Sequence, residues 1–364
     1  IHYSVKSNSN LSILRLLKSE GLNFDIVSGG ELLRLKKIGV AGSDIVFSGV
    51  GKTTAEIDLA LEERICFFNV ESPAEFDHIV ERAKFHKTIA NIALRINPDV
   101  DAATHEYITT GTSASKFGIN LDLAMNLYLA NKNNPYVNLC GLDMHIGSQL
   151  TDVKPIANAM KKFASFAQSL VNEGVPIRYL DVGGGLGIQY SVEKILSAKQ
   201  FATTIHQFLG NDLFKSCTTI IEPGRFLVGE SGILVTKLLY QKSQSGKTFY
   251  IVDAAMNDLI RPALYEAYHD IQPLIISSSE KVCVDVVGPV CESSDFFAHN
   301  RHLPKMNSND FVVVFNAGAY GASMTSNYNT RLRPAEVLVE GTSFRLIKSR
   351  ETYQELFDNE YKLL

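Results

Sequence analysis

The feature that most constrains the fold is an alternation of short apolar strands with amphipathic helical stretches through the first two thirds of this 364-residue chain. Such alternation predicts βαβ units and a parallel sheet. We predict strands at 1–6, 24–28, 45–49, 64–70, 91–97, 139–146, 179–182 and 218–222, and helices at 11–20, 30–38, 55–61, 73–83 and 157–173. Eight strands close a TIM-type (β/α)8 barrel, although an open doubly wound sheet shows the same alternation.

Polar residues near the carboxyl ends of these strands favour the barrel. They are Lys6, Asp25, Ser28, Ser48, Asn69, Arg95, His145, the glycines from Gly183 and Glu222. In a barrel all these strand ends meet at one face, where active sites lie. On one edge of an open sheet they would be too far apart to converge. We therefore expect a (β/α)8 barrel over residues 1–232.

The pattern changes in the last third of the chain. Strand-like runs at 233–240, 248–252, 281–287, 311–315, 335–340 and 343–348 are separated by turn signals, and 351–362 resembles a closing helix. This arrangement predicts an all-β domain over residues 233–364, a sandwich or a small barrel.

Composition excludes several function classes. The net charge is −4 and no long basic stripe is present, so no nucleic-acid partner is expected. The five cysteines lack metal-ligand spacing, which indicates reduced thiols in the cytoplasm and no metal. No apolar run reaches the length of a bilayer span, and no signal peptide is apparent. We expect further sequence before Ile1, because the chain starts without methionine and inside a strand.

Lys6 is the most informative single residue. It ends the first predicted strand, where a lysine side chain either lies in solvent or points its amine into a site. Three other features supply partners for the second option: the glycines from Gly183, the carboxylate of Glu222 and the imidazole of His145. They match the phosphate, pyridine nitrogen and ring face of pyridoxal 5′-phosphate (PLP), whose aldehyde forms a Schiff base with a lysine.

The glycine run Gly-Gly-Gly-Leu-Gly at 183–187 follows the seventh strand. Glycines let backbone N–H groups approach phosphate oxygens, although the same run also suits a tight strand-to-helix turn. Barrels bind phosphate in the loops after strands seven and eight, and this position favours the phosphate interpretation for Gly184 and Gly185.

Glu222 begins the sequence Glu-Pro-Gly-Arg at the end of the eighth strand. A carboxylate facing the pyridine nitrogen would keep it protonated, although a salt bridge at the barrel rim is equally compatible. His145 could stack on the cofactor ring with Ser148 donating to the phosphate, or it could be a core histidine. Arg95 and Asp25 could form an ion pair at the rim or orient the groups around Lys6.

Cys291 lies in a polar turn of the predicted β-domain, before Glu292. A thiol in such a loop can donate a proton to a carbanion. The other four cysteines fall within or against predicted strands and are expected to be small buried apolar residues.

Together these segments resemble the fold-type III PLP-dependent decarboxylases, over essentially the whole chain. The matching motifs are Tyr-Ser-Val-Lys-Ser-Asn at 3–8, Phe-Asp-Ile-Val-Ser-Gly-Gly-Glu-Leu at 24–32, His-Ile-Gly-Ser at 145–148, the glycines from 183, Glu-Pro-Gly-Arg at 222–225, Cys-Glu-Ser at 291–293 and Gly-Ala-Tyr at 318–320. The resemblance implies Lys6 as the Schiff-base lysine, His145 as the ring-stacking residue and Glu222 as the pyridine partner. It also implies Cys291 as proton donor. The expected cofactor contacts are Lys6, Asp25, Arg95, His145, Ser148, Gly184, Gly185, Glu222, Pro223, Gly224, Arg225 and Tyr320.

Residues 261–269, Arg-Pro-Ala-Leu-Tyr-Glu-Ala-Tyr-His, resemble the diaminopimelate branch of that family. There, Arg261, Tyr265 and Arg225 would bind a distal substrate carboxylate and Glu292 the distal ammonium, with Tyr320 also contacting substrate. A planar guanidinium matches a carboxylate with two parallel hydrogen bonds.

The resemblance implies decarboxylation of meso-2,6-diaminopimelate to L-lysine and carbon dioxide. It also implies a head-to-tail homodimer with shared active sites. Two alternatives stay open: a decarboxylase for ornithine, arginine or carboxynorspermidine, and an inactive homologue that binds and regulates a decarboxylase.

Overall fold

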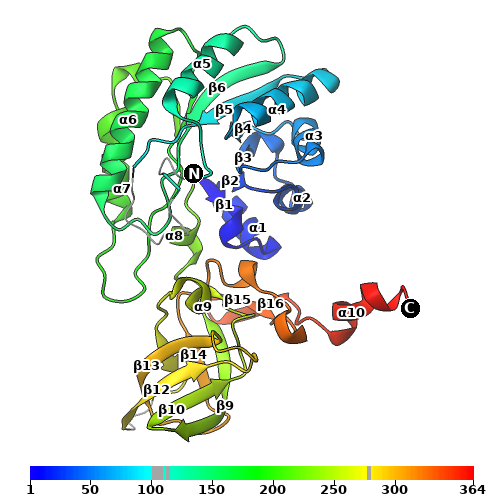
Figure 1. Ribbon diagram of the computed structural model, residues 1–364, viewed down its shortest axis with the longest axis vertical. Coiled ribbons are helices and arrows are strands. Elements are labelled where there is room, and N and C mark those ends of the chain that lie inside the picture. Colours follow the sequence, from blue (N-terminus) through cyan, green and yellow to red (C-terminus); the bar gives the residue numbers. More distant parts are fainter. Residues whose placement is uncertain (101–109, 112–114, 277–279) are drawn as a thin grey trace. The chain divides into compact units, whose positions relative to one another are not determined.

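The computed structural model of the chain describes residues 1–100, 110–111, 115–276 and 280–364 (Figure 1). It divides into two compact units. The first comprises Ile1–Ile188 and Lys194–Phe226, and the second comprises Gln189–Glu193 and Leu227–Leu364.

The first unit is built on eight parallel strands that pair in sequence order. They are β1 (His2–Ser4), β2 (Asn23–Ile26), β3 (Ile45–Phe47), β4 (Phe67–Val70), β5 (Ala90–Arg95), β6 (Val137–Asp143), β7 (Tyr179–Asp181) and β8 (Thr218–Ile220). The two ends of this sheet meet, because the N–H groups of His2 and Ser4 donate to the carbonyls of Ile221 (2.9 Å) and Pro223 (3.3 Å). The predicted (β/α)8 barrel is therefore confirmed.

Helices follow the strands on the outside of this sheet (Figure 1). The short α8 (Arg225–Val228) follows β8 in the chain, and the first unit ends within it, at Phe226. The outer helices are α1 (Leu11–Ser19), α2 (Gly29–Lys37), α3 (Thr54–Glu62), α4 (Pro73–Phe85), α5 (Leu121–Asn131), α6 (Val153–Asn172) and α7 (Ala198–Leu209). Polar side chains cap their first turns; Thr53 with Glu56 and Ser197 with Gln200 form reciprocal capping boxes. Helix α6 buries one apolar face through residues such as Met160 and Phe163.

Buried side chains from several strands fill the inside of the barrel. Val46, Phe67, Ala93, Cys140 and Ile220 pack together there. A barrel interior filled in this way is a core and not a channel. Reactive groups must therefore lie at the strand ends, where the loops begin.

Several predicted strands extend too far. Strand β1 ends at Ser4, and Lys6 lies in a 3₁₀ turn, Val5–Ser7. Strand β6 ends at Asp143 and β8 at Ile220, so His145 and Glu222 each lie two residues beyond a strand. The apolar character of the chain continues into these turns because they too are buried, and hydrophobicity alone does not mark where backbone pairing ends.

The second unit is mainly β-structure, as predicted. It contains β9 (Leu234–Gln244), β10 (Lys247–Val252), β11 (Ile271–Pro273), β12 (Lys281–Val287), β13 (Phe296–Pro304) and β14 (Phe311–Val314), in the sheet order β11-β14-β9-β10-β12-β13. A hairpin of β15 (Glu336–Glu340) and β16 (Ser343–Lys348), and helices α9 (Arg261–Tyr265) and α10 (Tyr353–Tyr361), complete it. The sequence-based prediction omits β11 and β13. Strand β13 carries His299, Asn300, Arg301 and His302, which obscure its alternation.

Buried residues such as Leu238, Tyr250, Val286, Phe297 and Val312 form the core of this unit. Among the residues that the structure describes, no helix has both the length and the apolar character needed to cross a membrane.

Candidate active site at the carboxyl ends of the barrel strands

Lys6 lies at the mouth of the barrel beside a buried carboxylate. Ser7 holds its turn through an Oγ that donates to the carbonyl of Ser4 (2.8 Å). The Lys6 side chain is 39% exposed, and its Nζ lies 4.0 Å from Oδ2 of Asp25 in β2. Asp25 is buried and accepts a hydrogen bond from Ser4 Oγ (2.7 Å). The amine is therefore accessible while a neighbouring strand supplies its counter-charge.

His145 is a half-buried ring held by the glycine turn. Its Nδ1 accepts the N–H of Gly184 (3.2 Å). Burial lowers the pKa of His145 well below its ordinary value, and the charges of Arg95 and Lys6 lower it further. The ring is therefore neutral, and since Nδ1 is an acceptor, the proton is on Nε2.

The glycine turn after β7 has a conformation that requires glycine. Gly183 and Gly185 have φ values of +67° and +100°. A Cβ on Gly184 would lie 2.1 Å from the carbonyl oxygen of Glu222, and one on Gly224 would lie 3.0 Å from Ser7 Oγ. These glycines therefore let the turns after β1, β7 and β8 pack together. Packing alone explains why these positions are glycine, and phosphate binding by Gly184 and Gly185 stays a prediction.

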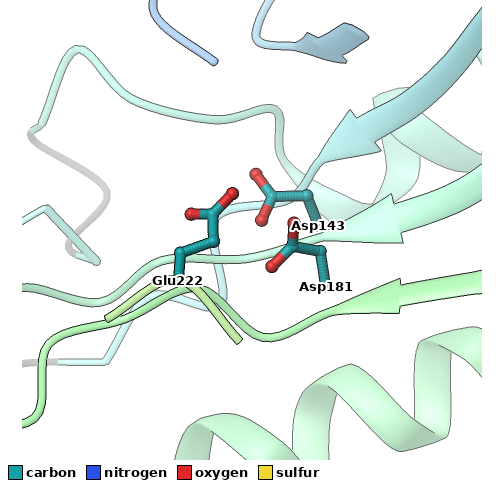
Figure 2. Close-up of side chains that lie close together, drawn as sticks. All are labelled: Asp143, Asp181 and Glu222. Carbon is teal, nitrogen blue, oxygen red and sulfur yellow. The ribbon is translucent and has the colours of Figure 1, made fainter. Parts of the chain in front are cut away.

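Three carboxyl groups meet beside this turn (Figure 2). Asp143 ends β6, Asp181 ends β7 and Glu222 follows β8, and their ligand oxygens lie within 4.8 Å of one another. All three side chains are buried. Each keeps one oxygen without a hydrogen-bond partner among the described residues, namely Asp143 Oδ1, Asp181 Oδ2 and Glu222 Oε1.

Burial and mutual repulsion hold protons on this cluster. Burial raises the pKa of Asp181 to about 6. Burial, followed by repulsion from Asp181, raises the pKa values of Asp143 and Glu222 well above their ordinary range. Asp143 and Asp181 are not among the predicted site residues. Their position at strand ends, the same signal that identified Arg95, would have identified them.

Arg95 belongs to a buried ion pair with Glu71, a residue that sequence reasoning missed. Its Nη1 donates to Glu71 Oε1 (3.0 Å), and its Nε lies 3.9 Å from Asp143 Oδ2. Glu71 also accepts the N–H groups of Gly49 (3.1 Å) and Gly118 (3.2 Å). Burial alone would lower the pKa of Arg95, but Glu71 and Asp143 raise it above its ordinary value. Glu71 thus ties together the loops around Arg95.

Arg225, the first residue of α8, is also buried. Its Nη2 lies 3.1 Å from Ser148 Oγ and donates to it. The barrel unit therefore contains one group of predicted site residues: Lys6, Asp25, Arg95, His145, Ser148, Gly184, Gly185, Glu222, Pro223, Gly224 and Arg225.

The second unit contains the other group: Arg261, Tyr265, Cys291, Glu292 and Tyr320. Arg261 is buried at the start of α9, with Nη1 2.8 Å from His269 Nε2 and its guanidinium 4.6 Å from the Tyr190 ring centroid. Tyr265 ends α9, and Tyr320 has a left-handed backbone (φ +58°).

Cys291 is exposed, as its polar loop predicts. Of the four cysteines expected to be buried, Cys140 is buried and Cys66 and Cys217 are half-buried, but Cys283 is exposed. That expectation is wrong for Cys283 because the side chain lies on the solvent-facing side of β12.

The barrel residues fit PLP. The buried, unpartnered Glu222 Oε1 and the raised pKa of its carboxyl call for a cationic N–H donor, which a protonated pyridine nitrogen provides. The accessible amine of Lys6 and the neutral ring of His145 suit the aldehyde and the ring face.

Comparison with known proteins agrees with this chemistry. Residues 1–229 match the family described as "Pyridoxal-dependent decarboxylase, pyridoxal binding domain". The chain is 44% identical over 362 residues to diaminopimelate decarboxylase from Neisseria meningitidis serogroup A, covering 100% of this chain and 88% of the relative. It is 45% identical over 358 residues to the enzyme of the same name from Haemophilus influenzae, covering 98% and 86%.

Solved structures show the same relationship. The structure of diaminopimelate decarboxylase from Helicobacter pylori complexed with L-lysine matches with a TM-score of 0.96 and 43% identity, covering 100% of this chain and 90% of that one. An arginine decarboxylase from Paramecium bursaria Chlorella virus, at 23% identity and a TM-score of 0.79, shares the fold. The chain therefore belongs to the pyridoxal-dependent decarboxylase family, among the diaminopimelate decarboxylases.

Proposed function

We propose that this protein is a PLP-dependent enzyme that decarboxylates meso-2,6-diaminopimelate to L-lysine and carbon dioxide. The observation that carries the proposal is identity of 44% or more over nearly the whole chain to diaminopimelate decarboxylases, combined with a barrel mouth whose residues fit PLP. When bound, PLP supplies an electron-accepting ring that stabilises the electron pair left by departing carbon dioxide.

The barrel residues bind and orient the cofactor in this proposal. Lys6 would hold it through its amine, Asp25 would orient that amine, and Glu222 would accept the pyridine N–H. His145, which is neutral and whose Nδ1 accepts the Gly184 N–H, would cover the ring face. Ser148, Gly184, Gly185 and Tyr320 would contact its phosphate. Pro223, Gly224 and Arg225 would make further contacts with the cofactor. Arg95, with Nε 3.9 Å from Asp143 Oδ2, partly opposes the rise in the pKa of Asp143 that burial and repulsion from Asp181 cause.

The second unit supplies substrate recognition and the proton. Arg261 and Tyr265, with Arg225 of a barrel unit, would bind the distal carboxylate. Glu292 would bind the distal ammonium, and Tyr320 would contact the substrate. Cys291 would protonate the α-carbon after carbon dioxide has left. A guanidinium fork suits a carboxylate, whereas a substrate such as ornithine, whose distal end carries only an amine, offers these arginines no distal carboxylate.

The proposed residues are divided between two compact units, which favours a head-to-tail homodimer with shared active sites. In such a dimer the second unit of one chain would complete the barrel site of its partner. All five cysteines are free thiols, which fits the reducing conditions of the cytoplasm, where we place the enzyme.

Assaying lysine and carbon dioxide release from meso-diaminopimelate, with ornithine and arginine as competing substrates, tests the proposal. Lys6→Ala should abolish turnover and the visible absorbance of the bound cofactor, because the covalent attachment is lost. Lys37→Ala, on the exposed face of α2, is the matched control and should retain both. Faster turnover of ornithine than of diaminopimelate by the wild type would overturn the substrate assignment.

A further inference from the structure

We infer that two adjacent residues, Tyr328 and Asn329, form a clamp. Tyr328 positions the carboxylate of Glu292, which would bind substrate, and Asn329 positions Cys291, the proposed proton donor. The inference rests on the proposed function for the roles of Glu292 and Cys291. Neither Tyr328 nor Asn329 is a predicted site residue.

The first half of the clamp fixes the Glu292 carboxylate. Tyr328 Oη donates to Glu292 Oε2 (2.7 Å), and Ser294 Oγ donates to Oε1 (2.6 Å). Glu292 is exposed, so its side chain would otherwise sample several rotamers. Hydrogen bonds from Ser294 and Tyr328 also lower its pKa, which keeps the carboxylate charged for a cationic ligand.

The second half holds the backbone of Cys291. Asn329 Oδ1 accepts the N–H of Cys291 (3.0 Å). The backbone of Asn329 is left-handed (φ +55°), a conformation that asparagine tolerates better than most residues other than glycine. Asn329 makes a non-helical kink within the segment Tyr328–Thr330. The hydrogen bonds of Tyr328 and Asn329 hold this segment against the Cys291 loop.

Both sides of the clamp are anchored to two adjacent residues, Met256 and Asn257. On the Cys291 side, buried Asp295 accepts the N–H of Met256 (2.7 Å) and, through its other oxygen, that of Val290 (2.7 Å). On the clamp side, the Ser326 N–H donates to the carbonyl of Asn257 (3.0 Å), whose side-chain oxygen accepts from Arg331 Nε (3.1 Å). The common anchor makes the clamp geometry a property of the folded unit.

The two halves should have separable effects. Losing the Tyr328 hydroxyl frees the orientation of Glu292, which weakens binding of the distal ammonium. Losing the Asn329 acceptor loosens the Cys291 loop, which misplaces the thiol at the protonation step. Tyr328 thus acts on KM and Asn329 on kcat.

The test uses the holoenzyme with two conservative variants. Tyr328→Phe should raise KM for diaminopimelate about fivefold with kcat within about twofold of wild type. Asn329→Gly allows the left-handed backbone and removes the side chain that carries the acceptor. It should lower kcat about fivefold and raise the rate at which iodoacetamide alkylates Cys291 by about threefold. Tyr240→Phe, at an exposed tyrosine of β9, is the control and should behave as wild type.

A double-mutant cycle separates positioning from direct substrate contact. If Tyr328 acts through Glu292, Tyr328→Phe should add no further rise in KM once Glu292→Gln is present. Additive effects would overturn the Tyr328 half of the clamp. Wild-type values of KM, kcat and alkylation rate in both single variants would overturn the whole inference while the proposed function stands. A wild type inactive on diaminopimelate would instead refute the proposed function, and the alkylation rates would still decide the Asn329 half.

Discussion

At the scale of the residue, Arg261 is the side chain to which the proposed function assigns recognition of the distal carboxylate. Its guanidinium is buried and lies against His269, whose Nδ1 faces the Phe315 carbonyl at 2.7 Å. Since Nδ1 faces an acceptor and Nε2 faces an arginine donor, His269 is the neutral Nδ1–H tautomer. The neutral ring therefore accepts a hydrogen bond from the guanidinium and orients it, and it adds no second positive charge beside Arg261.

Arg261→Ala should raise KM for diaminopimelate about tenfold or more, because losing a hydrogen bond to a buried carboxylate costs about 1–3 kcal/mol. The visible absorbance of bound PLP should persist. Arg261→Lys keeps the charge but loses the planar fork, so its KM for diaminopimelate should lie between those of wild type and Arg261→Ala. Thermal unfolding of each variant identifies any loss of folding at this buried position. A folded Arg261→Ala enzyme with the wild-type KM would show that another group reads the distal carboxylate.

At the scale of secondary-structure elements, the neighbouring ends of β6, β7 and β8 bring Asp143, Asp181 and Glu222 together (Figure 2). The folded-state pKa of Asp181, about 6, lies above the ordinary value of 3.8. The folded protein therefore holds this proton more tightly than the unfolded chain, and the free energy of unfolding falls as pH rises between about 4 and 6. The ionised carboxylate of Asp181 therefore destabilises the folded protein at neutral pH unless a nearby cation compensates its charge.

Asp181→Asn should remove this destabilisation. In PLP-free protein, its free energy of unfolding relative to wild type should rise by on the order of 3 kcal/mol between about pH 4 and 7. Denaturant titrations across this range measure the difference. Asp285→Asn is the control. Although burial raises the pKa of Asp285, hydrogen bonds from the Asn300 N–H and Lys247 hold it below its ordinary value of 3.8. The stability that Asp285 contributes is lost only below about pH 4, so the difference in unfolding free energy between this variant and wild type should stay nearly constant from about pH 4 to 7. If the free energies of unfolding of Asp181→Asn and wild type change in parallel with pH, the pKa of Asp181 is not raised in the folded protein.

At the scale of the whole molecule, the proposed chemistry is divided between two compact units. If the active sites are shared within a dimer, inactive Lys6→Ala and inactive Cys291→Ala subunits should complement each other. Each heterodimer would contain one wholly wild-type site and one doubly altered site, so a mixture at equilibrium should recover up to about a quarter of the wild-type activity. Mixing the two variants under conditions of subunit exchange tests this.

Subunit exchange must be measured independently, for example with two affinity tags. A mixture of Lys6→Ala with a second Lys6→Ala preparation is the control and should stay inactive. Demonstrated heterodimers without activity would mean that Cys291 serves the Lys6 of its own chain, or serves no site.

The sequence by itself was enough to predict the barrel and the strand ends that carry its candidate site residues. Strand and helix periodicities are local, so eight alternating units could be recognised without any long-range information. The same pattern places the polar residues of the strand ends on one face, since parallel strands in a barrel present their carboxyl ends on one face. Lys6, His145 and Glu222 were therefore identifiable before their distances were known.

Only the tertiary structure decided which of these groups interact and what restrains them. Asp143, Asp181 and Glu71 acquire their importance from burial beside other charges, and burial depends on the packing of several strands. Tyr328 and Glu292 are separated by 36 positions, and no local pattern indicates that one holds the other. Periodicity specifies the direction of a side chain within its own element. Partners, protonation and orientation depend on neighbours that the chain brings close only by folding.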